Sequence, residues 1–144
     1  SGHVRLYSWN GTALLKLGAD INGEAAGDYS GYSVSLSSDG QTVAIGAYDN
    51  DGNGSNSGHV RVYEYSSGSW SQVGSDIDGE ANTDYSGYSV SLDSDGSHVV
   101  IGAPENDGAG GYNSGHARIY QHGNPPARVP PKTPRTDPES PPFY

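Results

Sequence analysis

YSGYSVSLSSDGQTVAIGAYDNDGNGSNSGHVRVY, residues Tyr29–Tyr63, is the stretch that decides the fold, because it returns with few changes as Tyr85–Tyr120. Residues 1–56 align with residues 57–112 without a gap, and more than half of the aligned positions are identical. A third copy opens at Ser114. A repeat of about 56 residues is longer than helical repeats and close to the upper end for propeller blades. The chain is therefore a tandem array with copies that start at residues 1, 57 and 114.

Each repeat is predicted to hold four short strands. Residues 32–36 alternate apolar and polar side chains with a period of two, residues 42–47 do so more weakly, and residues 60–63 follow. A fourth strand is expected at residues 70–73, or at 14–17 in the earlier copy. Residues 1–122 then supply about two complete four-stranded antiparallel blades plus partial ones, all-β in class, and we expect that they cannot close a ring alone. Gly2–Tyr7 and His116–Tyr120 would border incomplete sheets that need other polypeptide.

Three submotifs of the repeat resemble a known family. Gly31–Leu36, Val43–Ala47 and Ser57–Tyr63 recur in the order and spacing of the FG-GAP repeat of integrin-α-type β-propellers, and Ile101-Gly102-Ala103-Pro104 is similar to the "GAP" signature of that family. The resemblance covers residues 1 to about 121. It implies propeller blades more firmly than it implies a function, because unrelated functions share one fold.

Composition excludes several classes of function. The net charge is −10, and an acidic surface argues against nucleic-acid binding, which draws its affinity from Lys and Arg on phosphates. No cysteine is present, so disulfides and thiolate metal sites are excluded. The sequence shows no membrane-spanning apolar run and no signal peptide, and a start at Ser1 rather than Met indicates a processed or excised piece. Two sequons, at Asn10 and Asn53, fall in predicted turns and favour a secreted glycoprotein at the cell surface or outside the cell.

Residues 123–144 form a separate proline-rich segment. They hold all but one of the nine prolines and show no strand periodicity, so an extended tail of the polyproline-II type is expected. Residues 128–134 fit a loose SH3-ligand pattern, and residues 141–144 fit the PPxY pattern of WW ligands. A plain linker or terminus is the alternative.

An acidic loop precedes the innermost strand of each repeat, at residues 20–28 and 76–84. Clustered carboxylates with a glycine turn are what Ca²⁺ requires, although Asp, Asn and Gly also make ordinary solvated turns. A second acidic loop joins the second and third strands at residues 49–55 and 105–111, and strand polarity places both loops at one end of the blade. A weak Ca²⁺ site is expected there with the ligands Asp76, Asp78, Glu80 and Asp107.

The resemblance implies a different calcium position. The integrin-type family commonly places its calcium motif, an Asp-rich loop, in the hairpin after the innermost strand, where this chain has only the short turns Ser37–Gly40 and Asp93–Gly96. These turns favour a plain hairpin, because too few oxygen ligands remain. The family also carries ligand contacts at the end that bears the acidic loops, which could bind a cation, a basic partner or a glycan, or nothing.

Three histidines recur at equivalent positions, His3, His59 and His116. Repeat symmetry sends them to three different blades, where they cannot converge on one ion, and each is expected to be a structural residue whose ring hydrogen-bonds locally. The arginines two positions later, Arg5, Arg61 and Arg118, are expected to meet neighbouring carboxylates or blades.

No catalytic constellation is recognised. The sequence has no nucleophile elbow, metal-binding helix or phosphate loop, and nothing selects a pair of carboxylates in contrasting environments. We expect a non-enzymatic extracellular binding or adhesion module that joins other copies or further blades and takes a protein or glycan ligand. The alternative is a structural surface or filament subunit that assembles through its repeats, and an appendage to an enzyme is a third possibility.

Overall fold

The computed structural model describes residues 1–121, which form twelve β-strands and no helix. The proline-rich segment, with its SH3- and WW-ligand patterns, lies outside the described residues. No helix within residues 1–121 has the length and apolar character needed to cross a membrane.

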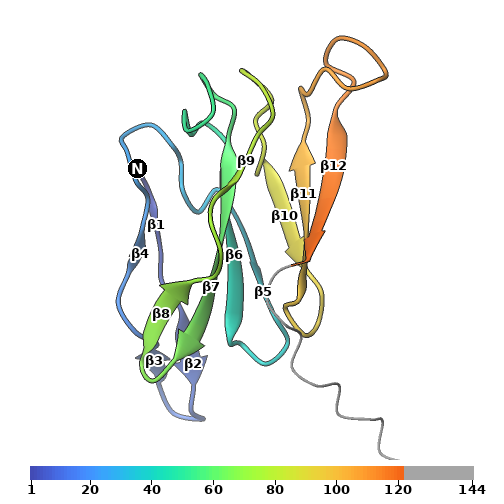
Figure 1. The fold of residues 1–144 in the computed structure, drawn as a ribbon. Coiled ribbons are helices and arrows are strands. Elements are labelled where there is room, and N and C mark those ends of the chain that lie inside the picture. Colours follow the sequence, from blue (N-terminus) through green and yellow to red (C-terminus); the bar gives the residue numbers. More distant parts are fainter. Residues whose placement is uncertain (122–144) are drawn as a thin grey trace, which may run out of the picture.

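The strands form three blades that stand side by side in an open row (Figure 1). The first blade holds two small antiparallel sheets, β1–β4 and β2–β3. Its strands are β1 (His3–Val4), β2 (Tyr7–Trp9), β3 (Leu14–Lys16) and β4 (Ile21–Asn22).

The middle blade is the complete one. Its antiparallel order is β5-β6-β7-β8, and β9 pairs with the first half of β7. The strands are β5 (Ser33–Leu36), β6 (Thr42–Ala47), β7 (His59–Ser66), β8 (Ser69–Gln72) and β9 (Ile77–Asp78).

The last blade has three strands in the order β10-β11-β12, which are β10 (Ser89–Leu92), β11 (His98–Ala103) and β12 (His116–Gln121). We call the contact between the first and middle blades the first junction, and the contact between the middle and last blades the second junction. Within residues 1–121 no strand pairing joins the last blade to the first, so the described part of the chain is not a closed propeller.

The fourth strand of the middle blade is interrupted, which the sequence did not predict. Val73 donates its N–H to the carbonyl of Val62, at 2.8 Å, and so extends the ladder of β8. Gly74 then takes a left-handed φ of 72°, which turns the chain away before it pairs again as β9. The first blade repeats this break at Gly18, whose φ is 69°. The expected strand Gly2–Tyr7 is also split, into β1 and β2.

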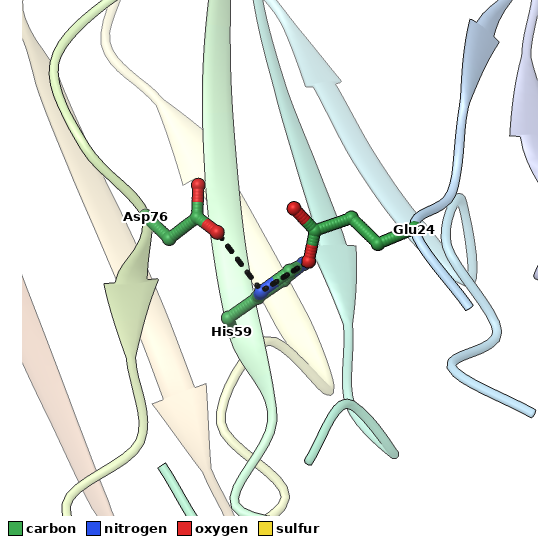
Figure 2. A group of neighbouring side chains, drawn as sticks. All are labelled: Glu24, His59 and Asp76. Atoms are coloured by element: carbon green, nitrogen blue, oxygen red, sulfur yellow. Dashed lines mark ion pairs between the residues drawn. The ribbon is translucent and has the colours of Figure 1, made fainter. Parts of the chain in front are cut away.

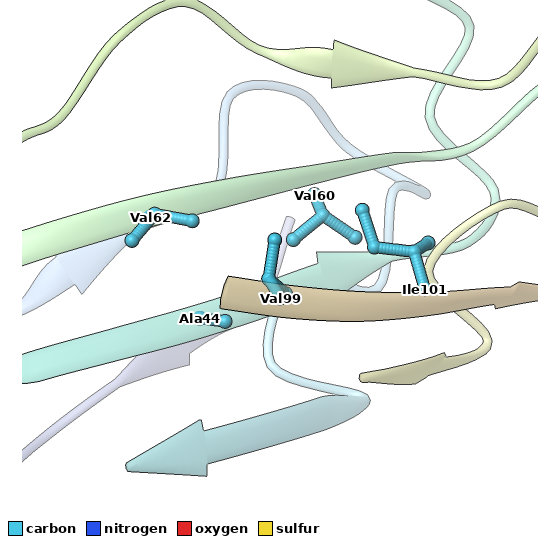
Figure 3. Packing of buried hydrophobic residues seen from close by; sticks show 5 residues of the cluster. All are labelled: Ala44, Val60, Val62, Val99 and Ile101. Carbon is cyan, nitrogen blue, oxygen red and sulfur yellow. The ribbon is translucent and has the colours of Figure 1, made fainter. Parts of the chain in front are cut away.

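Two apolar clusters fill the junctions, one on each face of the middle blade. Val43 and Ile45 of β6 pack with Leu6 and Ile21 at the first junction. Side chains on the opposite face fill the second junction, where Figure 3 shows Ala44, Val60 and Val62 facing Val99 and Ile101. Because alternate residues of a strand point to opposite faces, the two clusters interleave along β6. The middle blade is therefore stabilised from both sides.

The innermost strands, β5 and β10, meet through serine side chains. Ser33 Oγ donates to the carbonyl of Gly87 at 2.6 Å, and Ser35 Oγ accepts the N–H of Leu92 at 2.9 Å. Gly46 lies so close to Gly87 that a Cβ added to it would overlap the carbonyl oxygen of Gly87. Small residues thus allow the blades to approach closely at their inner edge.

Candidate functional site

Four loops gather at one end of the blades, the upper end in Figure 1. We call this end the loop face, made of residues 22–32, 48–57, 78–88 and 104–115. Two buried carboxylates organise it: Asn50 Nδ2 donates to Asp28 Oδ2 at 3.0 Å, and Asn106 Nδ2 donates to Asp84 Oδ2 at 2.7 Å. Backbone N–H groups of their own loops also donate to Asp28 and Asp84. These two aspartates therefore hold the loops in place, as buried charges require full hydrogen bonding.

Five tyrosines form a cluster on the loop face. Its hub is Tyr48, at the end of β6, whose ring centroid lies 4.6 Å from that of Tyr32 and 5.4 Å from that of Tyr88. Tyr29 and Tyr85, which precede β5 and β10, lie 5.6 Å and 6.0 Å from the same ring. Stacked and edge-on rings at such separations stabilise one another. The cluster is therefore assembled from two successive repeats.

The hydroxyls of this cluster are partly engaged with one another. Tyr32 Oη donates to Tyr88 Oη at 3.1 Å, and this bond raises the pKa of Tyr32. Burial, followed by the carboxylate of Asp49, raises the pKa of Tyr48. Tyr29, Tyr32 and Tyr88 nevertheless remain about half exposed. The cluster thus offers uncharged aromatic surface to solvent at neutral pH.

An open hollow of about 490 Å³ lies beside the tyrosine cluster. It is lined by Tyr48, Asp49, Asn56, Tyr85, Tyr88, Pro104 and Glu105. Pro104 stands in the last blade where the middle blade has Tyr48, so the last blade supplies no aromatic ring at that position. Two carboxylates and one amide on an aromatic wall can bind hydroxyl-bearing or cationic groups.

The carboxylates predicted as a calcium set face different partners. Asp76 Oδ2 and Asp78 Oδ1 point toward His59 Nδ1, at 3.7 Å and 4.0 Å. Glu80 instead pairs with Arg118 at 3.3 Å, and Asp107 Oδ1 accepts the N–H of Asn113 at 2.7 Å. Calcium binding by these four residues stays a prediction.

His59, at the start of β7, is the centre of a second group of polar side chains, shown in Figure 2. Its side chain is 1% exposed, and Glu24 Oε2 and Asp76 Oδ2 approach its Nδ1 at 4.0 Å and 3.7 Å from opposite sides. Burial lowers the pKa of His59, so the ring is neutral at neutral pH. The prediction that this ring makes a local hydrogen bond is wrong for Nδ1, which has no hydrogen-bond partner among the described residues.

The arginines meet carboxylates as predicted. Arg5 Nε pairs with Asp20 at 2.9 Å within the first blade, beside a contact of Lys16 with the same carboxylate. These contacts lower the pKa of Asp20, and Lys16 has the larger effect. Arg61 Nη1 pairs with Glu24 at 3.4 Å, and its Nη2 donates to the carbonyl of Asn22. Arg61 thereby ties the middle blade to the loop that leaves the first blade.

The hairpin where the resembled family carries calcium is occupied by its own hydrogen bonds. In the β10–β11 turn, Asp93 accepts the backbone N–H of His98 at 3.0 Å and contacts the ring of His98 at 2.7 Å. Asp95 accepts the N–H and the hydroxyl of Ser97. The backbone N–H of His98, more than its ring, lowers the pKa of Asp93. In the β5–β6 turn, Gln41 and Ser37 donate to Asp39 in the same manner. The Oδ1 atoms of Asp39, Asp93 and Asp95 accept backbone N–H groups, and the few remaining carboxylate oxygens of each turn fall well short of the six to eight oxygen ligands that Ca²⁺ takes.

The two sequons differ in the freedom of their amides. Asn10 Oδ1 caps the β2–β3 turn by accepting the N–H groups of Thr12 and Ala13. The Nδ2 of Asn53, which a glycan would occupy, instead donates to the carbonyl of Gly79 at 2.8 Å. Glycosylation at Asn10 and Asn53 stays a prediction, and the contacts favour Asn10.

Sequence reasoning missed the tyrosine cluster and the surroundings of His59. The recurrence of Tyr29 and Tyr32 as Tyr85 and Tyr88, at strand starts near the acidic loops, was a usable signal for the cluster. No comparable signal marked His59, because its carboxylate neighbours come from two other segments.

Antiparallel sheets that stack face to face, with one complete four-stranded blade between two partial ones, define this chain as a set of β-propeller-type blades. The family model described as FG-GAP repeat matches residues 17–63 and 75–120, and the chain belongs to this family. Both matched segments run from a fourth strand through the third strand of the next blade, which confirms the resemblance read from the three submotifs. A search among curated proteins found no match.

Proposed function

We propose that this chain is a non-enzymatic module that binds an extracellular protein or glycan through the tyrosine cluster of the loop face. The observation that carries the proposal is the half-exposed cluster around Tyr48, built jointly by two repeats and bordered by Asp49 and Glu105. FG-GAP repeats are usually non-catalytic binding modules. An adhesive role outside the cell agrees with the two sequons.

The chemistry of the hollow restricts the ligand. Tyrosine rings present apolar faces with a polar hydroxyl, which suits a sugar ring or a guanidinium group lying flat against them. Asp49 and Glu105 accept hydrogen bonds from hydroxyl or cationic groups, whereas they repel phosphate and sulfate. We therefore expect a neutral glycan or a basic protein segment as the ligand and no nucleic acid.

Screening on a glycan array and against a set of arginine-rich peptides tests this function. Tyr48→Ala removes the hub of the cluster and should weaken binding at least about tenfold, since aromatic hot spots contribute about 2 kcal/mol or more. Tyr112→Ala is the matched control, because Tyr112 is exposed on the same face and makes no ring contact with the cluster. Absence of saturable binding in both screens, or equal losses in the two variants, would contradict the proposal.

A second function, assembly through the repeats, is favoured by a separate observation. An apolar groove of about 570 Å³ lies between the first blade and β5. Its walls include Val4, Leu6, Leu17, Val34, Leu36 and Val43. In a complete blade the two inner strands that precede β1 would occupy this place. At the other end, Ile119 of β12 is 70% exposed. Two apolar ends of one array suit head-to-tail contact with further blades.

Light scattering on the 144-residue chain separates this second function from the first. Assembly predicts species larger than 15.0 kDa whose fraction grows with concentration. Ile119→Asp should abolish such growth because it places a charge on the exposed apolar end. A folded monomer that resists proteolysis at all concentrations would contradict assembly and leave ligand binding intact.

A further inference from the structure

The buried ring of His59 has an unpaired nitrogen that faces carboxylates. Nδ1 is inaccessible to solvent and makes no hydrogen bond within the described residues. A buried polar atom without a partner costs about 1–3 kcal/mol, so such an atom calls for a missing partner. Three carboxylate oxygens, of Glu24, Asp76 and Asp78, lie 3.7–4.0 Å from it. These separations are too long for hydrogen bonds and leave room for a small group between the atoms.

The arrangement matches the spacing of metal ligands. One ligand atom each from Glu24, His59 and Asp76 lies within 4.8 Å of the others. Tetrahedral bonds of 2.0–2.2 Å place ligand atoms about 3.4 Å apart, so the contacts of His59 Nδ1 with Asp76 and Glu24 need to shorten by about 0.3 and 0.6 Å. The two carboxylate oxygens must also approach each other from a separation of up to 4.8 Å. Glu24 and Asp76 can supply this movement because their side chains are 46% and 30% exposed, whereas His59 is fixed in the junction.

The local charge also favours a cation. Glu24, Asp76 and Asp78 carry three negative charges, and Arg61 at 3.4 Å from Glu24 Oε1 offsets one of them. A divalent cation would neutralise the remaining charge of −2.

We propose that Glu24, His59 and Asp76 bind one divalent metal ion of the Zn²⁺ class between His59 Nδ1, Glu24 Oε2 and Asp76 Oδ2. Asp78 Oδ1, at 4.0 Å from His59 Nδ1, adds to the negative charge around the site. The site connects the loop after β4, the start of β7 and the interruption between β8 and β9. It therefore links the first blade to the third and fourth strands of the middle blade.

The donor set selects the class of metal. Imidazole nitrogen with carboxylate oxygens suits Zn²⁺, Co²⁺ and similar ions, whereas Ca²⁺ requires six to eight oxygen ligands. The site therefore differs in both position and chemistry from the calcium-binding hairpin of integrin-type repeats.

Neighbouring side chains hold two of the ligands in position. Gln72 Nε2 donates to Asp76 Oδ1 at 2.6 Å, which leaves Oδ2 directed at His59. Arg61 holds Glu24 Oε1 and is itself fixed by the carbonyl of Asn22, so Oε2 stays on the side of the ring. Asn50 Nδ2 reaches the same Oε2 at 3.4 Å, a long contact that metal binding would loosen. Such second-layer hydrogen bonds orient metal ligands, and their loss typically lowers affinity 10–100-fold.

Calorimetric titration of the untagged, chelator-treated 144-residue chain with Zn²⁺ tests the proposal. We expect about one ion per chain, an affinity at least about tenfold weaker in Asp76→Asn and in Glu24→Gln, and no competition from millimolar Ca²⁺. Since His59→Asn could fail to fold, the direct test of His59 uses the wild-type chain. Zn²⁺ should shift the imidazole NMR signals of His59, and Co²⁺ should produce d–d absorption bands that Zn²⁺ removes.

Matched controls come from the repeat. His3→Asn and His116→Asn remove the two equivalent histidines and should leave the affinity unchanged, as should Asp93→Asn in the other acidic cluster of the described residues. Tyr48→Ala should also leave it unchanged, which keeps this test independent of the ligand-binding function. No saturable Zn²⁺ binding, binding unaffected by Asp76→Asn, or loss of binding in His116→Asn would each overturn the proposal.

Discussion

The first and second junctions place the same three residue types at matching positions, yet they enclose them to different degrees. Glu24, His59 and Arg61 at the first junction correspond to Glu80, His116 and Arg118 at the second. The carboxylate meets the arginine at 3.4 Å in one and 3.3 Å in the other. The histidine, however, is 1% exposed at the first junction and 25% exposed at the second.

The cause of the difference is the strand that follows. After β7 the chain continues through β8 and β9, which cover His59 and bring Asp76 to its ring. After β12 no described strand plays that part, so Glu80 and His116 lack a third partner of this kind. The repeat sequence thus encodes only part of each site, and the neighbouring strand completes it.

The largest expected effect tests how closely the inner edges of the blades approach. Gly46→Ala should lower the free energy of unfolding by about 3 kcal/mol, because its methyl group would overlap the carbonyl of Gly87 across the second junction. The equivalent change in the last blade, Gly102→Ala, should cost less than about 1 kcal/mol. There the close atom is the hydroxyl of Ser89, which can rotate away. Urea unfolding followed by the fluorescence of Trp70 measures both, and equal losses would refute the account.

A smaller effect is expected from truncation of the third strand. Val62→Ala removes two buried methyl groups at the second junction and should lower the free energy of unfolding by about 2 kcal/mol. Ile119, the equivalent residue of β12, is 70% exposed, so Ile119→Ala should stay within about 0.5 kcal/mol. The same unfolding assay, run at a concentration where light scattering shows monomer, compares them. A large loss for Ile119→Ala would mean that another part of the protein covers β12.

The smallest expected effect concerns stability at acidic pH and distinguishes the β10–β11 hairpin from the β5–β6 hairpin. Hydrogen bonding by the N–H of His98 lowers the pKa of Asp93 in the folded state, so its contribution to stability is present above the unfolded pKa of about 3.9. That contribution is lost as the pH falls below this value. Asp93→Ser gives the second hairpin the residue that Ser37 supplies in the first.

The free energy of unfolding of the variant should therefore fall less steeply between pH 5 and pH 2 than that of the unchanged chain. The difference should be well under 1 kcal/mol, because the side chain of Asp93 is exposed to solvent. Thermal unfolding at stepped pH measures the slope. A slope identical to that of the unchanged chain would show that Asp93 contributes nothing as a carboxylate.

Most of the fold could be predicted from the sequence because inner strands alternate and end at glycine turns. Residues 32–36 and 42–47 correspond closely to β5 and β6. The interruption of the fourth strand at Gly74 could not be predicted, since alternation shows which face a residue prefers and not whether its neighbour continues to pair. The break matters because it places Asp76 beside His59.

The site could be predicted only in part. Carboxylate-rich loops were correctly expected at one end of the blades. The pairing of the arginines with carboxylates could also be predicted, because opposite charges attract. The environment of His59 depends on Glu24, 35 positions earlier, and on Asp76, 17 positions later, and such a convergence arises only when blades stack. A local motif carries no information about it.

The serine contacts between β5 and β10 determine how such an array can grow. Ser33 and Ser35 face the next blade with hydroxyls, and the backbone groups that they meet belong to Leu92 of β10 and to Gly87, just before that strand, one repeat later. The contact therefore joins serine hydroxyls of one repeat, one donating and one accepting, to backbone groups of the next repeat, as in a head-to-tail polymer. This contact does not set the number of repeats in the array. Closure is then a matter of angle: the rotation between successive blades decides whether added repeats return to the first one or continue as an open spiral.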